Sequence, residues 1–262
     1  MKTKYLIIPL FIILLLVSCD LFNTEKTGSL LFKGVRVIPE TALSKTRSVP
    51  SGHPDSATVH HMYNMDIKFN AHEIYVSKDQ IQEDVTDNFT WVKIGENDEL
   101  KYMSEYEFLA DDIPEGTYMT LKIIFRNEII RYAVYAADTN TVVEMAGSLG
   151  EGAAGDTSLI INCFSLQGSF NVDSSGVLHL MSPGETFSPF SIVANRTTTI
   201  YWKGGAADVV YKLNDFTFDW YDNDGDSAWT PGVDAAVNYD GPADTPMWSF
   251  LVAPGGPTSI GK

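Results

Sequence analysis

Apolar and polar residues alternate along most of this chain with a period of two, the pattern of strands that bury one face. In residues 119–126 the odd positions carry Met, Leu, Ile and Phe, whereas three of the four even positions are polar. Residues 67–71 alternate in the same way, and the phase then slips before Ile74 and Val76, which predicts a β-bulge or a short break. Further strands are predicted at 29–38, 89–94, 129–135, 169–172, 177–181, 199–202, 209–213 and 216–220.

Helical periodicity is scarce in comparison. Tyr102, Tyr106 and Leu109 predict one short apolar helical stripe, and residues 80–85 predict another turn or two. Outside the N-terminal segment, no stretch of twelve or more residues keeps a 3.6-residue repeat. Many short strands separated by turn residues therefore predict an all-β fold, a mainly antiparallel β-sandwich.

The N-terminal segment has a different pattern. An apolar run over residues 5–17 follows two lysines and ends in Leu-Val-Ser-Cys at residues 16–19. The run is too short for a stable membrane-spanning helix, and the residues before the cysteine have the order of a bacterial lipoprotein signal. We expect cleavage before Cys19 and acylation at that residue, and two or three acyl chains hold a protein on a bilayer almost permanently. The alternative is an ordinary secretory signal that carries Cys19 by chance.

These patterns divide the chain into four parts. Residues 1–18 are the predicted signal peptide, and residues 19–27 are a short polar tether behind the lipidated cysteine. Residues 28–252 form the predicted β-sandwich body, and residues 253–262 a disordered tail. The segment 147–156 is rich in glycine and is interpreted either as a domain linker or as a hairpin loop within one body.

Composition limits the classes of partner. The 262 residues include 34 acidic and 18 basic side chains, a formal net charge of −16, and the predicted signal removes two lysines but no acidic residue. Nucleic-acid binding requires clustered Lys and Arg, and no such run exists, so this class is excluded. Cys163 is the only cysteine besides Cys19, and its apolar neighbours predict a buried, inert thiol rather than a disulfide.

One acidic segment suggests chemistry. Carboxylates at Asp222, Asp224 and Asp226 have the 1, 3, 5 spacing of a calcium loop, and position 7, Ala228, can offer its carbonyl. Asp234 falls one place beyond the usual closing position, and position 6 is not glycine. Two interpretations stay open: a structural Ca²⁺ site, or a solvated acidic hairpin loop.

Aromatic residues concentrate after residue 200. Trp220, Tyr221 and Trp229 lie in or beside the acidic segment, so on a surface these rings would stack on the faces of sugars. The alternative is that the rings belong to the core or close the ends of strands.

Five segments resemble, in order, a family of bacterial lipoproteins built on a domain of unknown function: IKFNAHEIYV (67–76), WVKI (91–94), IPEGTY (113–118), FSIVAN (190–195) and TTTI (197–200). The resemblance spans about residues 64–218. It implies a transthyretin-like or immunoglobulin-like sandwich in which 147–156 is an internal loop, and it implies no catalytic residue. In IPEGTY the Pro and Gly set a turn and the aromatic residue closes one end of the core.

The expected function is that of a non-enzymatic lipoprotein of the bacterial cell envelope, anchored to the outer membrane and serving structure or recognition. Asp20 would signal inner-membrane retention in enteric bacteria, but that rule does not extend to every lineage. Two alternatives stay open: a carbohydrate-binding or carbohydrate-processing surface lipoprotein that uses the C-terminal aromatic and acidic residues, and a subunit that binds another envelope protein through an apolar patch.

Overall fold

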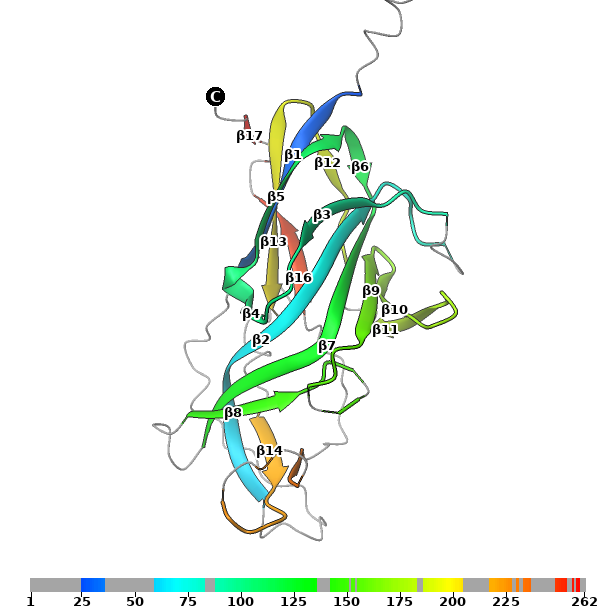
Figure 1. The fold of residues 1–262 in the computed structure, drawn as a ribbon. Helices are drawn as coiled ribbons and strands as arrows, with labels where there is room; N and C mark the ends of the chain where they lie inside the picture. The colour runs from blue at the N-terminus through cyan, green and yellow to red at the C-terminus, as the bar shows by residue number, and fades with distance from the viewer. Residues whose placement is uncertain are drawn as a thin grey trace, which may run out of the picture.

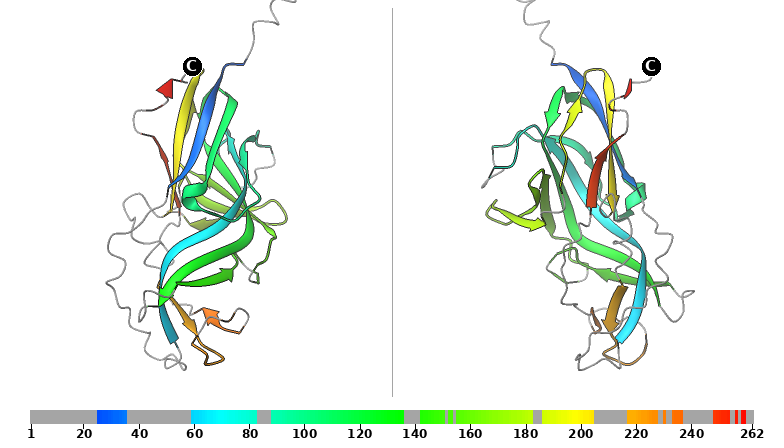
Figure 2. Two further views of the ribbon diagram at one scale, coloured as in Figure 1. Left: turned by 60° about the vertical axis from the view of Figure 1, so that its left-hand side comes forward. Right: turned by 180° about the vertical axis from the view of Figure 1, so that it is seen from behind.

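The computed structural model describes residues 25–35, 59–82, 88–135, 142–150, 152–153, 155–182, 186–204, 217–227, 230, 233–236, 248–253, 256 and 258–259. These residues form β-strands and one short 3-10 helix, η3 (Met103–Glu105), and contain no α-helix. The strands form two main sheets that pack face to face (Figures 1 and 2). The predicted all-β sandwich is therefore confirmed.

Sheet A is the smaller of the two. Its strands lie in the order β16 (Trp248–Val252), β13 (Arg196–Gly204), β1 (Thr27–Val35) and β5 (Glu107–Pro114), with β17 (Thr258–Ser259) also on β13. β1 and β13 run parallel, and the other pairs in this sheet are antiparallel.

Sheet B is built on two long antiparallel strands, β2 (Val59–Ser77) and β7 (Thr120–Tyr135). Its order is β11 (Leu178–Ser182), β10 (Gly168–Val172), β9 (Leu159–Ser165), β7, β2, β14 (Thr217–Tyr221) and β15 (Ala235–Ala236). β3 (Val92–Glu96) and β4 (Lys101–Tyr102) also pair with β2, and β8 (Val142–Gly147) pairs with β7. A separate pair joins β6 (Gly116–Tyr118) to β12 (Phe190–Ile192).

The predicted irregularity in β2 is confirmed. The register between β2 and β7 shifts between Ala71 and Glu73, as well as next to Phe69, so the side chains of Ile74 and Val76 return to the core after the slip. A bulge of this kind bends a strand and increases its twist. β2 and β7 indeed curve along most of the length of the body (Figure 1).

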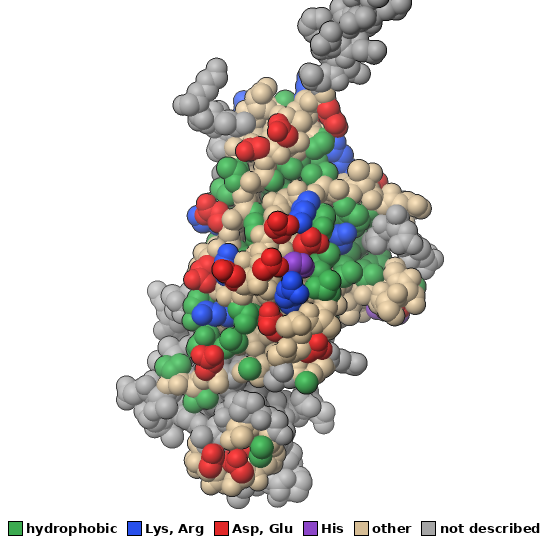
Figure 3. Space-filling model, in the orientation of Figure 1, with side chains coloured by type: hydrophobic (Ala, Val, Ile, Leu, Met, Phe, Trp, Pro, Cys, Tyr) green, Lys and Arg blue, Asp and Glu red, His purple; other side chains and the backbone are tan. Residues whose placement is uncertain are grey.

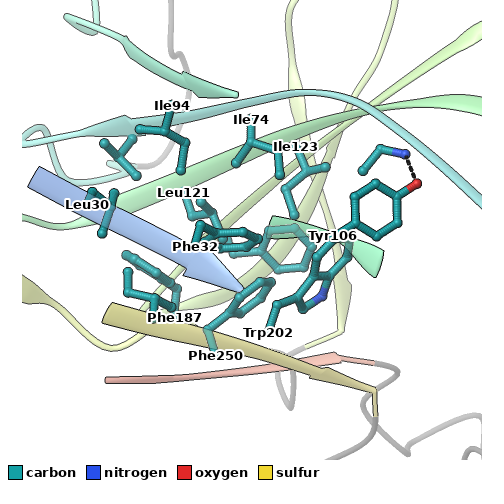
Figure 4. Close-up of a cluster of buried hydrophobic side chains, with 14 of the residues drawn as sticks. Leu30, Phe32, Ile74, Ile94, Tyr106, Leu121, Ile123, Phe187, Trp202 and Phe250 are labelled. Carbon is teal, nitrogen blue, oxygen red and sulfur yellow. Dashed lines mark hydrogen bonds between the residues drawn. The ribbon is translucent and has the colours of Figure 1, made fainter. Parts of the chain in front are cut away.

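An aromatic core fills the space between the sheets. Trp202 of β13 lies 5.7 Å from Phe32 of β1 and 5.3 Å, edge to face, from Phe69 of β2 (distances between ring centroids). Phe250 of β16 stacks on Trp202 at 6.3 Å (Figure 4). These four side chains are at most 5 % exposed, and such ring pairs contribute about 0.5–1.5 kcal/mol beyond the area that they bury.

Tyr106 ties the two sheets together at the bulge. Its hydroxyl accepts a hydrogen bond from the Ala71 amide at 3.0 Å (Figure 4). The same hydroxyl donates a hydrogen bond to the Phe69 carbonyl. The predicted helical stripe is therefore wrong: only 103–105 is helical, Tyr106 enters the core, and Leu109 lies on β5 with 60 % of its surface exposed. Tertiary hydrogen bonding at the bulge outweighs the local spacing.

The turn before β6 has the predicted design. Gly116 adopts φ +146°, a conformation that favours glycine, and Tyr118 is fully buried against Phe190. The Tyr118 hydroxyl donates a hydrogen bond to the Pro114 carbonyl at 2.9 Å, and burial raises the pKa of Tyr118 to about 12. The aromatic residue thus closes one end of the core.

Two segments differ clearly from the predictions. The strand predicted at 89–94 begins at Val92, and Thr258–Ser259, within the predicted disordered tail, pair with Thr197 and Arg196 of β13.

The segment 147–156 joins β8 to β9, which pair with successive parts of β7. The buried side chain of Asn127 holds this loop. It accepts a hydrogen bond from the Gly150 amide at 2.8 Å and donates one to the Asp156 carboxylate. The strand predicted at 209–213 lies outside the described residues.

Candidate metal centre

The acidic segment is the hairpin loop between β14 and β15. Tyr221 pairs with Ala235 and Trp220 with Ala236, so the loop 222–234 starts and ends at adjacent positions of an antiparallel pair. β14 in turn lies on the outer part of β2, where Tyr221 pairs with Val59. The loop therefore lies at the far end of the body from the start of β1 (Figure 1), and acidic side chains gather at this tip (Figure 3).

Three of the predicted ligands converge. The carboxylates of Asp222, Asp224 and Asp226 each offer an oxygen, and these oxygens all lie within 4.8 Å of one another. Asp222 is buried and the other two are exposed. The 1, 3, 5 spacing thus places the three carboxylates together, as the sequence predicted.

The backbone of the loop is turned tightly around Asp222. Gly225 has φ +76° and Ser227 has φ +62°, so two residues of the loop adopt the left-handed conformation. The Asp222 carboxylate accepts the Gly225 amide at 2.6 Å and the Ser227 amide at 2.9 Å, and these bonds hold the turn. For a non-glycine residue such as Ser227 this conformation is strained, so it persists only because its surroundings fix it.

Asp234 closes the loop. It is only 8 % exposed, and its carboxylate accepts the Asn223 amide at 2.8 Å and the Thr230 amide. The Asn223 side chain also donates to the Val233 carbonyl at 2.7 Å. Asp234 lies outside the group of three converging carboxylates, so in this structure it fastens the two ends of the loop. Asn223 was not predicted as a site residue, although Asn in a turn is a signal for such bonds.

This arrangement suits a hard cation. Ca²⁺ takes six to eight oxygen ligands from carboxylates, carbonyls and water on a flexible loop. Each carboxylate oxygen has two lone pairs, so Asp222 can accept backbone amides and still offer electrons to a cation. The three carboxylates also repel one another in the absence of a cation, and a bound divalent ion would relieve that repulsion.

The other predicted site residues cannot be placed in the same way. Cys19, Ala228 and Trp229 lie outside the described residues. Trp220 and Tyr221 lie on β14, but only their backbone is described. Lipidation and stacking on sugars therefore stay predictions.

Cys163 has the predicted character of an inert thiol. It is a free cysteine on β9 with no exposed surface, and burial raises its pKa to about 12. A thiol that is protonated and inaccessible at neutral pH is a poor nucleophile.

Ionisable side chains on the outer face of sheet B pair with one another. Lys93 contacts Glu73 at 2.8 Å and also pairs with Glu96, while Arg126 contacts Asp98 at 3.2 Å. The hydrogen bond from Lys93 holds the pKa of Glu73 below its usual value. Ion pairs between β3 and β2, within β3, and between β7 and the loop after β3 therefore account for these charges.

No protein-family model matches this chain, and no curated protein or solved structure matches it either. Membership of the lipoprotein family that the five segments resemble stays a prediction. Within the part of the chain that the structure describes, no helix has the length and apolar character needed to cross a membrane.

Proposed function

We propose that this protein is a non-enzymatic lipoprotein of the bacterial cell envelope, anchored to the outer membrane by acyl chains on Cys19 and serving a structural or recognition role. The proposal rests on the lipoprotein signal at residues 1–19 and on the place where the folded body begins. β1 starts at Thr27, at one end of the body, and leaves only a short tether behind the cysteine.

The tether limits the orientation of the body. Five residues separate Cys19 from Glu25, the first described residue, and the six extended steps that join the two residues span at most about 22 Å. Thr27, the first residue of β1, lies two residues further on, so an anchor at Cys19 would keep the start of β1 within about 29 Å of the membrane. The acidic loop lies at the opposite end (Figures 1 and 2) and would face away from the bilayer.

Metabolic labelling tests the anchor. Cells that express the full chain with a palmitate analogue should give a labelled protein in the membrane fraction, and Cys19→Ala should abolish the label. Cys163→Ala is the matched control, because Cys163 is the only other cysteine and should leave the label unchanged. Label that survives Cys19→Ala, or a wild-type protein without label, contradicts the proposal.

The converging carboxylates favour a second element of this function, a structural Ca²⁺ site in the loop 222–234. A ligand that binds only the native state stabilises it by about 2.7 kcal/mol at one hundred times its Kd. Calcium should therefore raise the melting temperature of the wild-type protein, and Asp224→Asn should remove that increase.

Glu99→Gln provides the control, because Glu99 is an exposed carboxylate outside the loop. The control variant should keep the full response to calcium. A wild-type melting temperature that is the same with calcium and with chelator contradicts the calcium site, whatever the result of the labelling.

A further inference from the structure

The outer face of sheet B changes character along the sheet. On β2 and β3 it carries the ion pairs described above, whereas on β9, β10 and β11 it is apolar. Residues directly opposite each other in adjacent strands share a face, and the register joins Ile124 of β7 to Ile161, Ile161 to Val172, and Val172 to Leu178. A second row joins Phe170 to Leu180. The outer apolar patch consists of Ile124, Ile161, Phe170, Val172, Leu178 and Leu180.

This patch is on the surface. Leu180 is 57 % exposed, and the other five members are partly exposed. Figure 3 views sheet B from this side and shows hydrophobic side chains gathered beside the charged region. Five of the nine exposed large hydrophobic residues in the described part of the chain belong to 159–181, namely Leu159, Leu166, Val177, Leu180 and Met181.

β11 is also an edge strand. Among the described strands it pairs only with β10, so the backbone groups along its other side have no partner strand there. Leu180 and its neighbour Met181 point to opposite faces and are both more than half exposed. Met181 shares its face with His179, whereas the face of Leu178 and Leu180 is apolar. An edge strand with exposed apolar side chains and unpaired backbone groups is a ready template for pairing.

Charge distinguishes this edge from the edge of sheet A. β5, at that edge, carries Glu107, Asp111 and Asp112, which protect it against pairing with another acidic chain. Residues 159–182 contain a single acidic residue, Asp173, and no Lys or Arg. Asp173 pairs with His179 at 2.8 Å. In a chain of net charge −16, this edge therefore presents very little charge to a like-charged molecule.

We propose that β11 pairs antiparallel with β11 of a second copy of this chain and that the two outer apolar patches join across the two-fold axis. An isologous contact of this kind is self-complementary, because each copy supplies the same strand. Centred on Leu180, it places the two Leu180 side chains next to each other and continues the row from Phe170 into the partner. The β10–β11 hairpin projects from the side of the body, where a second copy can reach it (Figures 1 and 2).

Disulfide trapping tests the contact. In an antiparallel pair, directly opposed Cα atoms lie about 4.5–5.5 Å apart, within the range of a disulfide. The full chain with Leu180→Cys, oxidised in cells, should give a reducible band at twice the monomer mass. Leu109→Cys is the matched control, because Leu109 is equally exposed on the β5 edge, and it should give no more of this band than the wild-type chain.

The composition of the band identifies the partner. When two differently tagged copies are expressed together, the Leu180→Cys band should contain both tags. A band that contains one copy joined to another protein overturns the proposal, as does a Leu180→Cys chain that gives no more dimer than Leu109→Cys. Leu180→Glu supplies a second measurement: native mass in detergent should fall from dimer to monomer, whereas Leu109→Glu should leave the dimer unchanged. Failure of the Cys19 labelling does not affect these outcomes.

Discussion

In the sandwich, Trp202 and Phe69 meet edge to face at 5.3 Å inside a core from which water is excluded, whereas in the loop 222–234 the backbone is held by carboxylates. The core is ordered by apolar contact, which depends little on pH or ions near neutrality. The loop is ordered by hydrogen bonds to charged groups at the surface, and the same groups repel one another. The two regions should therefore respond to different perturbations.

The region that stabilises the fold is therefore distinct from the region that carries the candidate functional site. The core explains why the body folds, and its residues are interpreted as packing residues. The described residues of the loop include no buried apolar side chain, yet they concentrate charge at the end of the body opposite the start of β1 (Figure 1). A perturbation that destabilises the core and the loop 222–234 equally would contradict this distinction.

The largest effect is expected from Trp202→Ala. Removal of a fully buried tryptophan deletes contacts with Phe32, Phe69 and Phe250 and leaves a cavity, at a cost of about 3–5 kcal/mol. Urea unfolding of the full chain should show this loss equally with calcium and with chelator. A loss that calcium reverses would mean that the core and the loop are not independent.

Tyr106→Phe should cost about 1–3 kcal/mol, because it leaves the Ala71 amide and the Phe69 carbonyl at the bulge without the hydroxyl that now pairs with both. Tyr201→Phe, on the opposite face of β13 from Trp202, is the control and should stay within about 0.5 kcal/mol. Equal losses in the two variants would contradict the role assigned to the Tyr106 hydroxyl.

Asp234→Asn should act locally. The amide keeps one acceptor oxygen, so one of the two bonds to Asn223 and Thr230 is lost, at a cost of about 1 kcal/mol. Hydrogen exchange of the affected loop amide should become about fivefold faster, whereas the amides of β1 and β13 should be unchanged. Unaltered protection at both loop amides would show that Asp234 does not close the loop.

Alkaline pH should weaken the fold through Tyr118. The pKa of Tyr118 is about 12 in the folded protein and near 10 in an unfolded chain, so above pH 10 the unfolded chain loses this proton first. The contribution of Tyr118 is complete below pH 10 and declines as the pH rises towards 12. The melting temperature should therefore fall less between pH 10 and 12 in Tyr118→Phe than in the wild type, and equal slopes would contradict the assignment.

The sequence pattern predicted the features that depend on neighbouring residues alone. The slip before Ile74 marked the bulge in β2, and the 1, 3, 5 spacing placed Asp222, Asp224 and Asp226 together. Local spacing failed at Leu109, because its distance in sequence from Tyr106 fits a helix. In the structure Leu109 pairs with Leu31 of β1, and Tyr106 bonds to the backbone of β2. The role of Asp234 was equally hidden, since its bonds to Asn223 and Thr230 depend on how the loop closes.

Pairing between distant segments was beyond the sequence pattern. The parallel pair of β1 and β13 joins Ser29 to Thr197, and nothing in either strand specifies the other. The outer apolar patch had a visible signal, because residues 159–164 and 177–181 are almost continuously apolar rather than alternating. Only the register showed that these residues meet on one exposed face.

The anchor at Cys19 is the central claim, and mass spectrometry of the N-terminal peptide of the mature protein from cell envelopes tests it most directly. We expect a peptide that begins at Cys19 and carries a diacylglycerol on its sulfur. A mature protein that keeps residues 1–18, or that is cut elsewhere and carries no acyl chain on Cys19, would contradict the account.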